Sequence, residues 1–239
     1  MAEEGLPREE ALKRIALVDS KGMVSSRRAD TLAANKLPFA HDLPLAGNLL
    51  DAVKVFKPTA IIGVSAQPKT FTKEVIEEMS ALNERPIIFA LSNPTSKAEC
   101  TAAEAYQWSD GRAIFASGSP FAPVSFGGKT FVPRQGNNSY VFPGIGLGCV
   151  IAQPTMIPTG VFLTAAKRLA ELVSQSDLDN GSMYPPLCQV RELSAEIAAA
   201  VAAYLYNKGL ARAERPADIL ATVKATMWSP ENPHFVCGE

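Results

Sequence analysis

The chain has 239 residues, of which 47% are hydrophobic and 20% charged, and its formal net charge is −1. This is the composition of an ordinary globular protein with enough chain for a real core, in one large or two smaller domains. A net charge so close to zero gives no electrostatic reason to expect a nucleic acid or an anionic membrane as partner. No apolar run approaches the roughly 20 residues that span a bilayer. The acidic start, Met1–Pro7, also lacks the apolar stretch of a signal peptide.

The cysteines and histidines argue against a structural metal centre. The four cysteines are far apart and form no CxxC pair, and the chain has two histidines, His41 and His234. We therefore expect free thiols in a reducing compartment and no metal ligands in this chain. Neither histidine has a partner that would make it a catalytic base, and Ser117-Gly-Ser119 is not a nucleophile elbow.

Strand and helix patterns alternate through the first half of the chain. The strand patterns are apolar throughout instead of alternating, which is typical of a parallel sheet covered on both faces. Right-handed crossovers then predict an α/β fold, an incomplete Rossmann-like doubly wound sheet. The predicted strands are 15–19, 60–64, 86–91 and 113–117. The predicted helices are 45–57, 72–82 and 101–108, the last with a capping-box spacing.

After Gly118 the alternation ends, and the chain is predicted to be all-helical in its C-terminal part. Residues 126–132 predict a hairpin around Gly127-Gly128, and helical stripes follow at 159–175, 190–206 and 216–227. The run Gly144-Ile-Gly-Leu-Gly148 predicts close helix packing in preference to a phosphate loop. We divide the chain into a nucleotide-binding domain at 1–138, a helical segment at 139–209 and a small terminal segment at 210–239.

Candidate cofactor residues lie at or after the ends of the first three predicted strands. An acid at the end of such a strand, here Asp19, binds the ribose 2′-hydroxyl of NAD in dinucleotide folds. The cations that follow favour the 2′-phosphate of NADP, since a dianion needs charged donors, although a solvated basic loop is the alternative. Ser65, in the loop after the second strand, is a further candidate, with a plain turn as the alternative. The cofactor candidates are Asp19, Ser20, Lys21, Lys36, Ser65 and Ser92.

Asparagines form the candidate substrate site. Asn93 follows the third predicted strand in Leu91-Ser-Asn-Pro-Thr95, and Asn137 and Asn138 lie in a loop bounded by glycine and proline. An amide both donates and accepts hydrogen bonds without charge, so these side chains suit a carboxylate or a nicotinamide amide. A capping or turn role is the alternative for Asn93.

Several longer motifs, in this order, resemble the C-terminal part of malic enzymes, in the style of the NADP-linked plant or bacterial type. The resemblance runs from about Gly5 to Pro230. The motifs are Leu17-Val-Asp-Ser-Lys-Gly22, Phe71-Thr-Lys-Glu74, Pro86-Ile-Ile-Phe-Ala-Leu-Ser-Asn-Pro-Thr95, Ala113-Ile-Phe-Ala-Ser-Gly-Ser-Pro-Phe121, Gly136-Asn-Asn-Ser-Tyr-Val-Phe-Pro-Gly144 and Tyr184-Pro-Pro186.

The resemblance implies roles for the candidate residues. Asn93 and Asn137 resemble the malate-carboxylate ligands, and Asn138 a neighbour at the nicotinamide–malate junction. Ser20, Lys21 and Lys36 resemble the adenosine-phosphate contacts of NADP-preferring members, with NAD possible. Arg134, where glycine is usual, and the turn 66–69 depart from the pattern.

The resemblance also implies an activity: oxidative decarboxylation of L-malate to pyruvate and CO2 with formation of NADPH, assisted by Mg or Mn. The family's general base, acid, substrate arginine, metal carboxylates and G-x-G-x-x-G loop belong to regions before Met1. We therefore expect a truncated form, inactive alone, that would be cytoplasmic, or plastid or mitochondrial if a presequence precedes it. Segment 139–209 would pack on the catalytic domain, and the end of the chain would join a homo-oligomer. The alternatives are a non-catalytic remnant or interaction module, and a malolactic-type enzyme.

Overall fold

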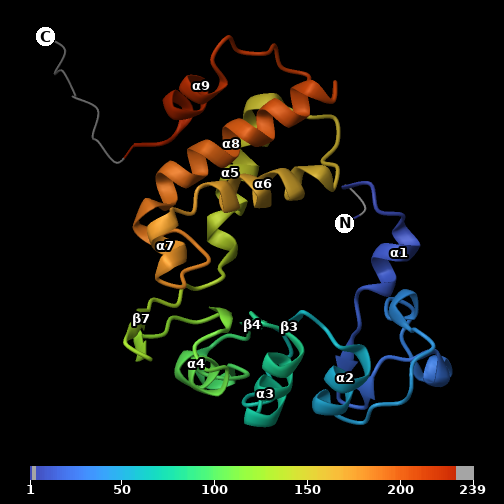
Figure 1. Cartoon of the computed structure of the whole chain (residues 1–239). Coiled ribbons are helices and arrows are strands. Elements are labelled where there is room, and N and C mark those ends of the chain that lie inside the picture. Colours follow the sequence, from blue (N-terminus) through green and yellow to red (C-terminus); the bar gives the residue numbers. More distant parts are fainter. Residues whose placement is uncertain (2–3, 230–239) are drawn as a thin grey trace, which may run out of the picture. The chain divides into compact units, whose positions relative to one another are not determined.

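The computed structural model describes residues 1 and 4–229, which form two compact units (Figure 1). Unit 1 comprises Met1–Asn137 and the returning segment Val173–Pro185. Unit 2 comprises Asn138–Leu172 and the chain from Pro186 onward. Each unit is built around its own packed core, so each is described separately below.

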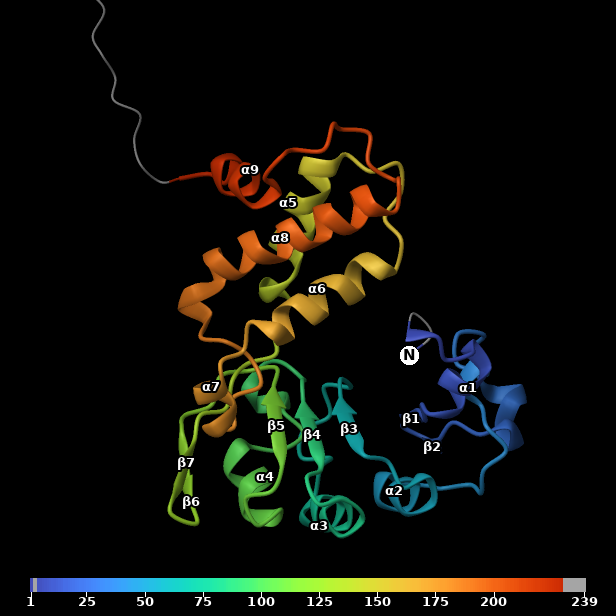
Figure 2. The ribbon, with the colours of Figure 1, turned by 45° about the horizontal axis from the view of Figure 1, so that its top comes forward.

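Unit 1 contains a parallel β-sheet, which confirms the predicted α/β class. Its strands are β3 (Ala60–Gly63), β4 (Ile87–Ala90) and β5 (Ile114–Ser117), in that order, and they point the same way in Figure 2. The register aligns Ile61 with Ile88 and Phe115. Three of the four predicted strands therefore lie in one sheet, and their carboxyl ends share one edge.

The prediction that Ile15–Asp19 forms a further strand of that sheet is wrong. Its last two residues form β1 (Val18–Asp19), which pairs antiparallel with β2 (Gly22–Met23). Val18 is exposed. The apolar run predicted a buried strand, but a parallel strand needs a neighbouring strand, and among the described residues no sheet strand pairs with Ile15–Leu17. The Leu17 carbonyl accepts a backbone hydrogen bond from the Val24 N–H at 2.8 Å, on the side of the short hairpin. The short hairpin forms instead.

The helices of unit 1 begin and end where their capping residues stand. Thr72 caps α3, and Thr101 and Glu104 form the predicted capping box of α4. Lys57, in a left-handed conformation before Pro58, ends α2, which begins after its Asn48 cap instead of at Leu45. The helices are α1 (Arg8–Lys13), α2 (Leu49–Phe56), α3 (Lys73–Leu82), α4 (Ala102–Trp108) and α7 (Gln175–Asp179).

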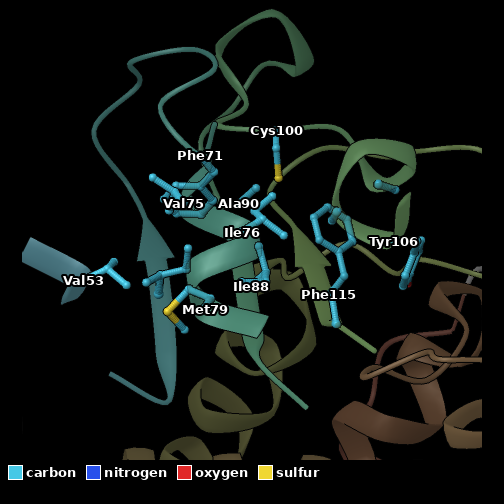
Figure 3. Packing of buried hydrophobic residues seen from close by; sticks show 14 of the residues in the cluster. Val53, Phe71, Val75, Ile76, Met79, Ile88, Ala90, Cys100, Tyr106 and Phe115 are labelled. Carbon is cyan, nitrogen blue, oxygen red and sulfur yellow. The ribbon is translucent and has the colours of Figure 1, made fainter. Parts of the chain in front are cut away.

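The core of unit 1 lies between the sheet and the helices α3 and α4. Ile76 of α3 packs against Ile88 of β4, and Tyr106 of α4 lies edge-on to Phe115 of β5, as Figure 3 shows. Side chains alternate across a strand, so the opposite face carries Ile62, which is 60% exposed. The sheet therefore buries one face within this unit while β3 leaves apolar surface open on the other.

A β-hairpin continues the chain after the sheet. Strands β6 (Val124–Phe126) and β7 (Lys129–Phe131) pair antiparallel around Gly127-Gly128, both with positive φ. This confirms the predicted turn. Phe131 stacks on Tyr106 with ring centroids 4.1 Å apart, which attaches the hairpin to the core.

Unit 2 is helical, as predicted. Its helices are α5 (Phe142–Ala152), α6 (Gly160–Glu171), α8 (Val190–Asn207) and α9 (Ile219–Thr226). The apolar stripe of α8 is buried from Leu193 onward, at Leu193, Ile197, Val201 and Leu205. Gly144 and Gly148 lie where α5 meets α8: an added Cβ would come within 2.7 Å of Ile197 and of the Ala198 carbonyl. The glycines thus serve close helix packing, as predicted. Helices with the length and apolar character needed for a bilayer span do not occur among the described residues.

Candidate functional site

The strongest electrostatic feature of unit 1 is a carboxylate clamped by cations at the β1–β2 hairpin. Asp19 accepts hydrogen bonds from Lys36 Nζ at 2.6 Å, from Arg28 Nη2 at 2.9 Å and from the Lys21 backbone N–H at 2.9 Å. Arg28 also donates to the carbonyls of Gly22 at 3.0 Å and Met23 at 2.9 Å. The arginine fork therefore joins the acid to the backbone of the hairpin.

This environment keeps Asp19 ionised. Partial burial of the carboxylate acts to raise its pKa, but hydrogen bonds from Lys36, the Lys21 backbone and Arg28 outweigh it and hold the pKa well below its usual range. One negative charge then faces two positive ones, and exposed Lys21 adds a third cation beside them. The cluster has a net positive charge, which fits a phosphate dianion.

The candidate residues at the sheet edge come from neighbouring strand ends. Ser65 and Asn93 are exposed in the loops after β3 and β4, and Asn93 is joined to Pro94 by a cis peptide bond. Beside β5, the Gly136 N–H donates to the Ser117 carbonyl at 2.7 Å. Asn137 follows directly, so it comes from the same edge as Ser65 and Asn93.

The remaining predicted residues have different settings. Ser20 is exposed in the β1–β2 turn. Ser92 is buried, and its hydroxyl donates to Glu99 and accepts from the Ala66 N–H at 2.9 Å, so its side chain is turned into the fold. Asn137 is the last residue of the first stretch of unit 1, whereas exposed Asn138 begins unit 2. Their roles as ligands remain predictions.

Two residues of these networks were missing from the candidate set. Arg28 is one of the cations that follow Asp19, and it makes more hydrogen bonds to the hairpin than Lys36, which is a candidate residue. Glu99 is fully buried and bonds to Ser92. Acidic residues lie mostly at the surface of proteins, so the sequence pattern does not indicate that Glu99 is buried. The available signal was its place between two apolar residues, Ala98 and Cys100, just ahead of the capping box that begins at Thr101.

Arg134, the departure from the family pattern, faces the returning segment of unit 1. Its Nη2 lies 3.7 Å from Asp177 Oδ1 of α7, and its Nε has no partner among the described residues. Asp177 also accepts a hydrogen bond from Ser174 at 2.6 Å. The arginine thus contributes to attaching α7 beside the segment that leads to Asn137.

The part of the chain that the structure describes offers no metal site. It contains no group of three or more His, Cys, Asp or Glu side chains placed to hold an ion. His41 Nε2 lies 2.7 Å from the Ile15 carbonyl, a structural contact, while His234 and Cys237 lie outside the described residues. The thiols of Cys100, Cys149 and Cys188 are free, and burial raises the pKa of Cys100. The Mg or Mn expected for the family therefore does not fit these residues.

A parallel sheet with helices packed on it and polar loops at its carboxyl edge is the arrangement of dinucleotide-binding α/β domains. The family model described as "Malic enzyme, NAD binding domain" matches residues 1–206. The chain therefore belongs to the malic enzyme family, in the part that forms its NAD(P)-binding domain.

Individual relatives agree with this assignment. The chain is 52% identical to "NADP-dependent malic enzyme, chloroplastic" of Flaveria pringlei over 96% of this chain, and 52% identical to "NADP-dependent malic enzyme" of Vitis vinifera over 94%. It spans only 36% and 38% of the length of these curated relatives. The crystal structure of Entamoeba histolytica malic enzyme superposes with a TM-score of 0.68 at 24% identity, covering 88% of this chain and 41% of that one, which supports the fold.

Proposed function

We propose that this chain is the NADP-binding part of a malic enzyme that converts L-malate to pyruvate and CO2 with formation of NADPH. The observation that carries the proposal is the Asp19 cluster: one acid bonded to Arg28 and Lys36, with Lys21 beside it. The printed names of the relatives support it, since both name NADP.

The same cluster favours NADP over NAD. An acid that binds the ribose 2′-hydroxyl must offer a free acceptor, but Asp19 already accepts three hydrogen bonds of the roughly four that a carboxylate can take, so little acceptor capacity remains. Lys36 and Lys21 retain donors, since an ammonium group carries three. A 2′-phosphate gains charged hydrogen bonds from these donors, whereas a hydroxyl gains little. The adenosine 2′-phosphate is thus the group that this surface recognises.

The asparagines orient the substrate in this proposal. Asn93 and Asn137 hold the malate carboxylate, and Asn138 contacts the nicotinamide–malate junction. Bound NADP supplies the acceptor for a hydride from C2 of malate. Uncharged amides bind a carboxylate without adding a charge of their own to the site. Ser65 and the chain at Ser92 approach the nucleotide from the strand ends.

The chain alone should bind the nucleotide only weakly and should not turn malate over. Among its described residues no group of three or more His, Cys, Asp or Glu side chains is placed to hold a metal ion, and residues 1–18 contain no G-x-G-x-x-G to bind the pyrophosphate. We further propose that the whole protein is a homo-oligomer. A cytoplasmic location stays our proposal, with the plastid as the alternative because a relative is named chloroplastic.

Calorimetric titration of the purified chain with NADP and NAD tests the proposal. We expect NADP to bind at least about tenfold more tightly, a difference of about 1.4 kcal/mol, and Lys36→Ala to abolish the preference. Lys73→Ala, which removes an exposed lysine paired with Glu77 at 3.6 Å, should leave it intact. Equal affinity for both nucleotides would contradict the assignment to NADP. Malate- and Mn-dependent NADPH formation by this chain alone would contradict its predicted inactivity.

A further inference from the structure

A buried carboxylate joins the loops at the carboxyl edge of the sheet. Glu99 is fully buried between the turn Thr95–Lys97 and α4. Its carboxylate accepts hydrogen bonds from the Ser92 N–H at 3.3 Å and from the Ser92 hydroxyl. The same hydroxyl accepts from the Ala66 N–H at 2.9 Å. One side chain thus connects the loop after β4 to the loop after β3.

The backbone around Glu99 repeats this connection. The Lys69 N–H donates to the Ala98 carbonyl and the Phe71 N–H to the Glu99 carbonyl, both at 3.1 Å. Gly63, the last residue of β3, lies against the Glu99 side chain so closely that an added Cβ would be 2.3 Å from its carboxyl carbon. The end of β3 and the loop after it are therefore shaped around this residue.

The loop held in this way has an unfavourable backbone. Ala66 and Lys69 both adopt left-handed conformations, with φ of 55° and 57°. Such angles are costly for residues with a Cβ and persist where the surroundings fix them. In both cases the surroundings are identified: the Ala66 N–H is held through Ser92 by Glu99, and the Lys69 N–H by the neighbouring Ala98 carbonyl.

Packing alone does not account for an acid at this position. A buried carboxylate is expensive unless it is hydrogen-bonded, and an apolar residue would fill the space at lower cost. The next residue shows the contrast: Cys100 is also buried, and its side chain points into the apolar cluster in Figure 3. Glu99 instead directs its oxygens to the loops that carry Ser65 and Asn93.

We propose that Glu99 is a positioning residue of the nucleotide and substrate edge: through Ala66 and Ser92 it fixes Ser65 and Asn93. This inference rests on the proposed function of that edge. Glu99 itself contacts no ligand in this arrangement. Its removal should therefore loosen the loops first and weaken nucleotide binding as a consequence.

Hydrogen exchange and nucleotide titration of Glu99→Gln test the proposal. Glutamine has nearly the same shape but cannot accept both hydrogen bonds from Ser92, because one oxygen becomes an NH2 group. We expect amide exchange at residues 64–71 and 91–93 to accelerate about tenfold or more, and the Kd for NADP to rise about tenfold, with an unchanged circular dichroism spectrum. Ser92→Ala, which removes the bridging hydroxyl, should reproduce the change at Ala66 if Glu99→Gln does not fold.

Cys100→Ala is the matched control, since it removes a buried side chain at the adjacent position without touching the loop hydrogen bonds. It should lower the melting temperature and leave both loop exchange and the Kd unchanged. If it raises the Kd as much as Glu99→Gln at an equal loss of melting temperature, the role is packing alone and the proposal is overturned. Wild-type exchange rates in Glu99→Gln would overturn it as well. If the wild-type chain binds no NADP, the proposed function fails, and the exchange data alone decide whether Glu99 fixes the loops.

Discussion

At the scale of single residues, the ionised Asp19 should make stability depend on pH. Its folded pKa lies below the unfolded value, which is about 3.9 for aspartate, so its contribution is fully present above that value. The contribution is lost as pH falls through the unfolded pKa toward the folded one. Asp19→Asn should therefore reduce the free energy of unfolding by about 1–2 kcal/mol at pH 7 and by a smaller amount at pH 3, where the contribution of the carboxylate has begun to fall but is not yet lost.

Urea unfolding of wild type and Asp19→Asn at the two pH values measures this difference. Asp42→Asn is the control, because Asp42 pairs with Arg27 at 3.3 Å while its side chain is 82% exposed. Such exposed pairs contribute little, so this variant should be within about 0.5 kcal/mol of wild type at both pH values. The prediction is wrong if the loss in Asp19→Asn is as large at pH 3 as at pH 7.

Replacing Arg28 with lysine should lower the stability of the fold, because the geometry of the guanidinium group matters as well as its charge. Its guanidinium contacts Asp19 and the carbonyls of Gly22 and Met23 at once, a fork that a single ammonium cannot reproduce. Arg28→Lys should cost about 1–2 kcal/mol of stability. Arg27→Lys, at the exposed neighbouring position, should cost less than about 0.5 kcal/mol. Thermal unfolding of both variants measures the contrast, and equal losses would show that charge alone matters at Arg28.

At the scale of elements, the glycines of α5 give opposite predictions for one chemical change. Alanine normally stabilises a helix over glycine by about 0.5–1 kcal/mol. At Gly148 the new methyl group would come within 2.7 Å of the Ala198 carbonyl and 2.8 Å of Val201, so Gly148→Ala should instead destabilise by about 1–3 kcal/mol. At Gly146 an added Cβ meets nothing within 4 Å, so Gly146→Ala should stabilise. Calorimetric melting of the two variants tests this, and two shifts of the same sign would refute the α5–α8 packing.

The elements that could be predicted from the sequence are those whose signals are local. The residues that limit the helices lie within a few positions of the helix ends. Examples are the capping residues Thr72 and Thr101 and the helix-breaking Pro58. The prediction of a sheet strand at Ile15–Asp19 was wrong because membership of a sheet depends on a neighbouring strand that is distant in sequence. The return of the segment Val173–Pro185 to unit 1 could not be predicted from hydrophobic periodicity for the same reason.

The candidate site divides in the same way. Asp19 and Lys36 were predicted from residue type and order, and the structure joins them in one ion pair, although their role toward NADP stays a proposal. Glu99 and the inward turn of Ser92 could not be predicted, because burial of a polar group depends on which loops meet around it. Local sequence patterns thus identify candidate ligand-binding side chains better than they identify the buried residues that hold those side chains in place.

At the scale of the whole molecule, the open edge of β3 should govern association. Among the described residues β3 pairs only with β4, and Ile62 and Val64 are 60% and 74% exposed. An unpaired edge beside exposed apolar side chains is a template for pairing with another chain, and parallel sheets are normally covered. The purified chain should therefore self-associate as its concentration rises. Ile62→Lys should suppress this, because a charged side chain at an edge opposes strand addition.

Light scattering during size-exclusion chromatography, over a range of loading concentrations, measures this association. Leu45→Lys is the control, since Leu45 is 63% exposed but lies before α2, outside the sheet. It removes a similar apolar area and adds the same charge, so general solubility would respond equally to both variants. Association through the edge should respond to Ile62→Lys alone. Equal suppression by both variants would show that hydrophobic surface in general, and not the strand edge, drives the association. If both variants still associate as strongly as the wild type, the contact between chains lies elsewhere on the chain.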